Sequence, residues 1–189
     1  MSGECRVRFP IIDLTAARSD SIDQAAALLH DAFRGRTHDW QDLDSARREV
    51  IESMSEEKIS RVALGDSDRV IGWIGAQPSY DGHVWEIHPL VVAAPHRGQG
   101  IGRTLVRDLE DIVRQKGGIT LWVGTDDENG ETSLSGIDLY RDLPGALRTI
   151  KGRDPHPYGF YMKLGFTLVG VMPDANGPGK PDIFLAKRV

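Results

Sequence analysis

The sequence is poor in cysteine and in long apolar runs, and it has no excess of positive charge. Cys5 is the only cysteine among the 189 residues, which excludes an internal disulfide and a cysteine-rich metal site. No apolar run approaches the roughly 18 residues that a membrane-spanning helix needs. The first ten residues, MSGECRVRFP, lack the apolar core of a signal peptide. We therefore expect a cytoplasmic protein with no metal and no membrane partner.

The charge balance argues against nucleic acid as a partner. The chain carries 23 Lys and Arg against 28 Asp and Glu, a formal net charge of −5, whereas nucleic-acid binders present basic surfaces. An acidic cleft would instead attract a cationic partner. The length and the 40% hydrophobic content fit one globular domain spanning residues 1–189.

The spacing of apolar residues predicts a mixed α/β sheet. Helical spacing covers residues 21–33, 44–54, 102–116 and 158–165, with Asp20 or Ser21 as the first cap. Strand-like stretches rich in β-branched residues cover 60–66, 69–78, 84–93, 119–125, 166–172 and 182–188. The polar segment 126–157 shows no clean period, and a loop of that length in a compact domain is more often functional than idle.

The segment APHRGQGIGRTL, residues 94–105, predicts an anion site at the start of a helix. The first amides of a helix have no partners within it, and the helix dipole adds positive charge there. Glycines let the backbone close on a phosphate, and Arg97 adds a planar cation. A glycine turn without a ligand is the alternative.

Two other nucleotide motifs fit this loop less well. A P-loop ends in Gly-Lys followed by Ser or Thr, whereas Gly102 is followed by Arg103 and Thr104. A dinucleotide fingerprint reads G-x-G-x-x-G, whereas Gly98, Gly100 and Gly102 give G-x-G-x-G.

Two stretches in the expected order resemble the hallmarks of the GNAT family of N-acetyltransferases. VVAAPHRGQGIGRTLV resembles its motif A, R/Q-x-x-G-x-G/A, with Arg97, Gly100 and Gly102 at the fixed positions. FYMKLGF, residues 160–166, resembles its aromatic-tyrosine helix. The resemblance covers about residues 21–189 and implies the GNAT fold, a single domain whose splayed mixed β-sheet is flanked by helices. Ala94 stands where the family usually has proline, which should shift the turn slightly and keep the phosphate site.

The resemblance implies that the chain binds acetyl-coenzyme A and uses no metal. The loop amides would bind the pyrophosphate, and the preceding strand would pair with pantetheine like an added strand. The residues expected to bind the coenzyme are Leu90, Val91, Val92, Arg97, Gly98, Gln99, Gly100, Ile101, Gly102 and Arg103.

Acetyl transfer to an amine needs a neutral amine, a polarised thioester carbonyl and a proton for the leaving thiolate. Cys5 has no histidine nearby, so direct attack by the amine is the better hypothesis, and the resemblance implies the same. It also implies that Tyr161 protonates the thiolate, with Tyr158 as the alternative. Glu86 or His88, on one face of a strand, could take the amine proton. We prefer Glu86, since a lone strand histidine is more often structural.

The acidic run TDDENGE, residues 125–131, together with Asp174 and Asp182 beside the loop 173–182, favours a cationic acceptor. A solvated acidic loop is the alternative. LWVGTDDENGETSLSGIDLY, HPYGFYMKLGF and VGVMPDANGPGKPDIFLAKRV resemble a branch of the aminoglycoside 6′-N-acetyltransferases. This resemblance implies that Thr125 and Asp126 help to hold the amino sugar. From their places on the strands we also expect Asp127 and Glu86 to contact the acceptor. Trp40 could stack on a sugar ring.

Other acceptors and a non-enzymatic role stay open, because the fold alone does not name a substrate. A polyamine, another small amine or a protein N-terminus could be the acceptor. A binding module could use acetyl-coenzyme A as a signal, although Tyr161 and the acidic strand end speak against it. A homodimer is also left open.

Overall fold

A computed structural model of the protein describes residues 9–35, 39–153 and 156–189. These residues form one seven-stranded sheet with the order β1-β2-β3-β4-β5-β7-β6. The chain divides into two compact units, residues 1–78 with 87–115 and residues 79–86 with 116–189, here called unit 1 and unit 2. Cys5 lies outside the described residues, so the prediction made for it stays a prediction.

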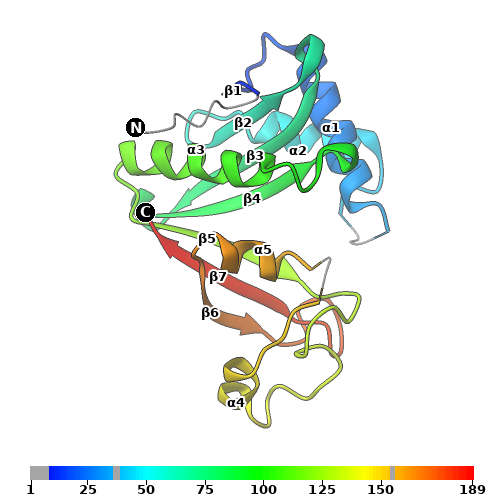
Figure 1. Ribbon diagram of the computed structural model, residues 1–189, viewed down its shortest axis with the longest axis vertical. Helices are drawn as coiled ribbons and strands as arrows, with labels where there is room; N and C mark the ends of the chain where they lie inside the picture. Colours follow the sequence, from blue (N-terminus) through cyan, green and yellow to red (C-terminus); the bar gives the residue numbers. More distant parts are fainter. Residues whose placement is uncertain (1–8, 36–38, 154–155) are drawn as a thin grey trace, which may run out of the picture. The chain divides into compact units, whose positions relative to one another are not determined.

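Unit 1 is a sheet covered by helices on both faces. Its strands are β1 (Ile11–Asp13), β2 (Ile59–Leu64), most of β3 (Val70–Ser79) and the second half of β4 (Val84–Val92). Figure 1 shows α3 (Ile101–Gln115) on one face, with α1 (Ser19–Phe33) and α2 (Leu43–Glu52) on the other. Strands β1, β2 and β3 pair antiparallel.

Alternation along β3 explains this two-sided packing, because successive strand residues point to opposite faces. Trp73 is fully buried in a cluster with Leu29 of α1 and Val50 of α2. A Cβ on the preceding residue, Gly72, would lie 2.9 Å from Cγ2 of Ile101 on α3. The absence of a side chain at Gly72 therefore lets the glycine-loop helix pack closely on the sheet.

Unit 2 extends the sheet with β5 (Thr120–Asp126), β6 (Thr167–Met172) and β7 (Asp182–Arg188). The start of β4 pairs parallel with β5 over Val84–Glu86, and β7 pairs antiparallel with both β5 and β6. Its helices are α4 (Leu143–Arg148) and α5 (Tyr158–Lys163). The sheet is therefore mixed and open, as predicted.

The predicted helices and the six predicted strands are confirmed to within a few residues. The predicted cap of α1 was wrong: the helix begins at Ser19 after Arg18, whose side chain caps nothing. Strand β1 and helix α4 were not predicted. No described helix is long and apolar enough to cross a membrane.

Candidate active site

The glycine loop joins β4 to α3 and leaves open space before the helix. Gly98 and Gly100 have φ angles of +76° and +88°, a left-handed conformation that glycine adopts without steric cost. A Cβ built at either position would meet no atom within 4 Å. The carbonyl of Gly100 accepts the amide of Thr104 at 3.0 Å, which closes the first turn of the helix.

This loop fits the pyrophosphate of a coenzyme. Among the described residues, none accepts a hydrogen bond from the backbone amides of residues 98–103. The exposed Arg97 donates from Nε to the carbonyl of Val92 at 3.1 Å, which holds the guanidinium beside the loop. Unpaired donors, a helix dipole and an adjacent arginine together stabilise a multiply charged anion.

Burial alternates along β4 as the sequence pattern predicts. Trp85, Ile87 and Val91 are buried, whereas Glu86 and His88 are only partly covered. The ladder to β5 pairs only Val84–Glu86 with Thr120–Trp122. Residues 90–92 therefore have no β5 partner in that ladder, and their pairing with pantetheine stays a prediction.

His88 and Trp40 lie together in unit 1. The His88 ring centroid is 5.7 Å from that of Trp40, and His88 Nε2 is 3.8 Å from Oε1 of Glu49 on α2. The Trp40 ring also packs edge-on against Phe33 at 4.8 Å, and the Trp40 carbonyl lies 3.0 Å from Nδ1 of His30. These contacts give both predicted site residues structural partners.

Tyr161 lies on α5 and is only 4% exposed. Its ring packs against Phe160 at 5.0 Å and Phe166 at 5.2 Å. Burial raises the pKa of the Tyr161 phenol, so the hydroxyl stays protonated at neutral pH and can act as a donor. In the described part of the chain, Oδ1 of Asp182 is the one buried side-chain oxygen or nitrogen without a hydrogen bond. The Tyr161 hydroxyl is therefore not a buried group that lacks a hydrogen bond.

Strands β4, β5 and β7 bring carboxylates and aromatic rings to one face of unit 2. Asp126 pairs in register with Asp182, and Glu86 pairs with Trp122. The Trp122 ring packs edge-on against Phe184 at 5.7 Å, and both rings are partly exposed. We call these five residues the carboxylate–aromatic face. Its charge and its apolar rings suit an amino sugar.

Asp182 was expected only as one of the carboxylates that attract a cation, and not as a direct ligand of the acceptor. A Cβ on Gly124 would lie 2.8 Å from Oδ2 of Asp182, so the glycine makes room for the carboxylate. Burial, and then the charges of Asp126 and Glu86, raise the pKa of Asp182 to about 6. Asp126 itself is exposed and accepts from Nδ2 of Asn176 at 2.6 Å. A cation bound at this face would relieve the repulsion between the carboxylates.

Asp127 has a different environment from its neighbour Asp126. Asp127 is fully buried, and its two oxygens accept from Glu131 N at 2.7 Å, Thr132 N at 2.8 Å and Thr132 Oγ1 at 2.7 Å. These bonds fold the start of the long segment back on itself. Asp127 has no exposed oxygen for an acceptor, and we assign it to the loop rather than to substrate.

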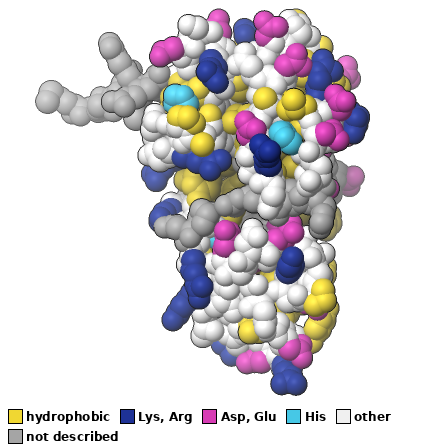
Figure 2. All heavy atoms as spheres, turned by 90° about the vertical axis from the view of Figure 1, so that its right-hand side faces the viewer, with side chains coloured by type: hydrophobic (Ala, Val, Ile, Leu, Met, Phe, Trp, Pro, Cys, Tyr) yellow, Lys and Arg dark blue, Asp and Glu magenta, His cyan; other side chains and the backbone are white. Residues whose placement is uncertain are grey.

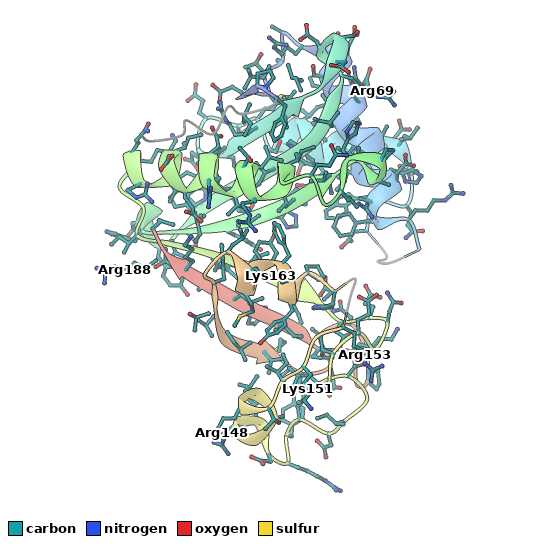
Figure 3. All side chains as sticks on the ribbon, viewed as in Figure 1. Arg69, Arg148, Lys151, Arg153, Lys163 and Arg188 are labelled. Atoms are coloured by element: carbon teal, nitrogen blue, oxygen red, sulfur yellow. The ribbon has the colours of Figure 1, made fainter. Side chains whose placement is uncertain are left out.

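Charged side chains of both signs occur on the surface. Figure 2 shows acidic and basic side chains interspersed on the face drawn, without a continuous basic surface. Figure 3 labels five cations of unit 2: Arg148 on α4, Lys151 and Arg153 after it, Lys163 at the end of α5, and Arg188 at the end of β7. Unit 2 is therefore not uniformly acidic, and the carboxylate–aromatic face is a local feature.

Comparisons with known proteins agree with this site. Residues 23–143 match the family model described as Acetyltransferase (GNAT) family, so the chain belongs to the GNAT family. Its enzymes transfer the acetyl group of acetyl-coenzyme A. No group of three or more His, Cys, Asp or Glu that could hold a metal occurs among the described residues.

Solved structures of aminoglycoside 6′-N-acetyltransferases are similar to this chain over nearly its whole length. One, complexed with coenzyme A, is 41% identical with a TM-score of 0.87, covering 95% of this chain and 96% of the other. Another, from Enterococcus faecium, is also 41% identical with a TM-score of 0.85 and the same coverage. An aminoglycoside 6′-acetyltransferase type Ii is 37% identical with a TM-score of 0.73, again with that coverage. A search of curated proteins found no match.

Proposed function

We propose that this acetyltransferase transfers the acetyl group of acetyl-coenzyme A to the 6′-amine of an aminoglycoside. The observation that carries the proposal is the 41% identity over 95% of the chain to aminoglycoside 6′-N-acetyltransferases. The carboxylate–aromatic face supports it independently. An aminoglycoside combines several ammonium groups with sugar rings, and both find complementary groups on this face.

The acceptor is held by unit 2 in this proposal. Asp126 pairs with one ammonium group, and Asp182 beside it takes a second hydrogen bond from the same group or from its neighbour. Charge-assisted hydrogen bonds of this kind are about twice as strong as neutral ones. The role of Trp40 in stacking on a sugar ring stays a prediction, because Phe33 and His88 pack against its ring.

The coenzyme supplies an activated acetyl thioester. The amine reacts only when it is neutral, since an alkylammonium with a pKa near ~10 has no free lone pair. We assign removal of its proton to Glu86, directly or through a water. Glu86 is partly exposed on the carboxylate–aromatic face, whereas His88 packs between Trp40 and Glu49.

Tyr161 is the proposed general acid. The neutral amine nitrogen forms a bond to the acetyl carbon, the carbon–sulfur bond breaks, and the electron pair leaves with sulfur. The nitrogen gives up its second proton to water as the amide forms. The Tyr161 phenol then gives its proton to the thiolate, and the phenolate that results regains a proton from solvent. The raised pKa of Tyr161 keeps that proton in place until the thiolate forms. Tyr158 is the alternative donor.

Thiol release with a panel of amines tests the proposal. Kanamycin, tobramycin, spermidine, lysine and a peptide N-terminus are each offered with acetyl-coenzyme A. We expect the aminoglycosides to show the highest kcat/KM. Faster turnover of spermidine would instead favour polyamine acetylation, and coenzyme binding without any turnover would favour a binding module. The cytoplasmic location, the homodimer and the single domain over 1–189 stay predictions.

A further inference from the structure

His156 is the one buried histidine among the residues that the structure describes. It is 3% exposed and lies just before α5, at the end of an otherwise polar segment. Nδ1 of its ring is 3.1 Å from the backbone nitrogen of Tyr158. Nε2 is 3.2 Å from the backbone carbonyl of Asp126. The two ring nitrogens thus contact the start of a helix and the end of a strand.

In these two contacts each ring nitrogen has a defined role. A backbone amide can only donate, so Nδ1 must accept the hydrogen bond from Tyr158. A backbone carbonyl can only accept, so Nε2 must carry the proton and donate it to Asp126. The imidazole is therefore neutral and in the Nε2–H tautomer. An imidazolium would present a second N–H to the Tyr158 amide, and that bond would be lost.

The ring joins the two parts of unit 2 on which the proposed chemistry depends. Asp126 ends β5 and belongs to the carboxylate–aromatic face. Tyr158 begins α5, three residues before Tyr161, and the N-cap of α5 makes no side-chain hydrogen bond of its own. Tyr161 of α5 also contacts the Phe166 ring, which lies 6.0 Å from Nζ of Lys187 on β7.

We propose that His156 is a positioning residue, whose neutral ring holds the helix of Tyr161 in place against the strand end of Asp126. It touches neither the acceptor nor the coenzyme in this account. Its effect is to hold the general acid and an acceptor ligand in one fixed relation. This inference rests on the proposed function, since it assigns Tyr161 and Asp126 their roles there.

Two conservative variants separate the two bonds. His156→Asn can still accept the hydrogen bond from the Tyr158 amide, but it loses the bond donated to the Asp126 carbonyl. His156→Gln can keep the bond donated to Asp126, but it loses the bond from the Tyr158 amide. We expect each to fold, to bind acetyl-coenzyme A with wild-type affinity by calorimetry, and to lower kcat roughly 10- to 100-fold, the range for misplacement of a catalytic group. His83→Asn is the control, because that exposed histidine forms a turn contact with Tyr80 in the same unit. Its kcat should match wild type.

A double-mutant cycle tests whether His156 acts through Tyr161. In a Tyr161→Phe background, His156→Asn should lower kcat by less than about threefold, because residues acting as a unit are not additive. Fully additive losses of kcat in the double variant would overturn the proposal. Wild-type kcat in both His156→Asn and His156→Gln would also overturn it. If restoring the thermal stability of a His156 variant also restores its kcat, the role of His156 is structural alone. That result would also overturn the proposal.

Nitrogen NMR of the ring keeps the inference separate from the proposed function. We expect the neutral Nε2–H tautomer at pH 7, with Nδ1 as acceptor. An Nδ1–H tautomer or an imidazolium would overturn the inference whatever the activity. If no amine is acetylated, the proposed function fails, whereas the ring shifts and the hydrogen exchange of the Tyr158 amide still decide whether the link exists.

Discussion

Asp126 and Asp182 are register partners across the β5–β7 ladder, so two carboxylates meet at the same end of one sheet face. Oδ1 of Asp182 is buried, and the described residues offer it no hydrogen-bond partner. Such an arrangement is costly without a cation, because buried acceptors lose their solvation and like charges repel. We therefore regard this pair as the centre of the proposed acceptor site.

Asp126→Asn should raise KM for an aminoglycoside by roughly 10- to 100-fold, in line with the loss of a charge-assisted hydrogen bond. The affinity for acetyl-coenzyme A should be unchanged. The effect should shrink in high salt, because Asp126 is exposed and screened. Steady-state kinetics at two salt concentrations measure it. Asp138→Asn, in the same long segment and paired with Arg141, is the control, and an unchanged KM for Asp126→Asn would remove Asp126 from the site.

Asp182→Asn should flatten the dependence of stability on pH. The pKa of Asp182 is raised to about 6 in the folded protein, above the ordinary value of 3.8 for an aspartate. Between these values the folded state binds more protons than the unfolded state, so the free energy of unfolding of the wild type falls as pH rises. The variant lacks this loss. Urea unfolding at pH 4 and pH 7 should show equal stabilities at pH 4 and a more stable variant at pH 7. Parallel changes in both proteins would contradict the burial of this carboxylate.

Gly100→Val should weaken the binding of acetyl-coenzyme A by about tenfold or more, which corresponds to 1.4 kcal/mol. The valine would fill the open space before the loop amides, and it would be strained at a positive φ. Gly117→Val is a matched control, since Gly117 ends the same helix region with φ +84° and equally open surroundings. Calorimetry should show a loss of affinity only at position 100. An equal loss in both variants would point to helix strain instead of a lost site.

Tyr161→Phe should lower kcat by roughly 100- to 10,000-fold, the contribution typical of a general acid. Coenzyme affinity should change little, because the ring and its packing against Phe160 and Phe166 are retained. Tyr158→Phe is the comparison, and its kcat should stay near wild type. If the two results are exchanged, Tyr158 is the donor and Tyr161 is structural.

Sequence patterns between neighbouring residues were enough to predict the glycine loop, the longer helices and the long strands. The glycine loop is a continuous motif whose geometry depends on residues next to each other, so its positive φ angles and open backbone follow from the glycines themselves. The helices and long strands follow from apolar periodicity. Strand β1 has only three residues, and α4 has six that include a proline and a glycine, so neither shows a readable period.

The roles of Asp127, Asp182 and His156 depend on contacts that sequence distance hides. Asp182 meets Asp126 across 56 positions only because β5 and β7 pair in that register. His156 is buried by a strand end 30 residues away. Asp127 did carry a readable signal: it shares the parity of the buried Val123 and Thr125, whereas Asp126 shares that of the partly exposed Trp122. Strand alternation thus distinguishes the ligand candidate from the loop anchor.

The most direct test of the central claim compares two aminoglycosides that differ at one group, neomycin with a 6′-amine and paromomycin with a 6′-hydroxyl. Thiol release from acetyl-coenzyme A is followed with each, and the product is analysed by NMR. We predict rapid release with neomycin, a product acetylated at the 6′-nitrogen, and little release with paromomycin. Equal rates with both drugs, or acetylation at another nitrogen, would contradict the proposed regiospecificity. Release with neither drug would contradict the aminoglycoside acceptor itself.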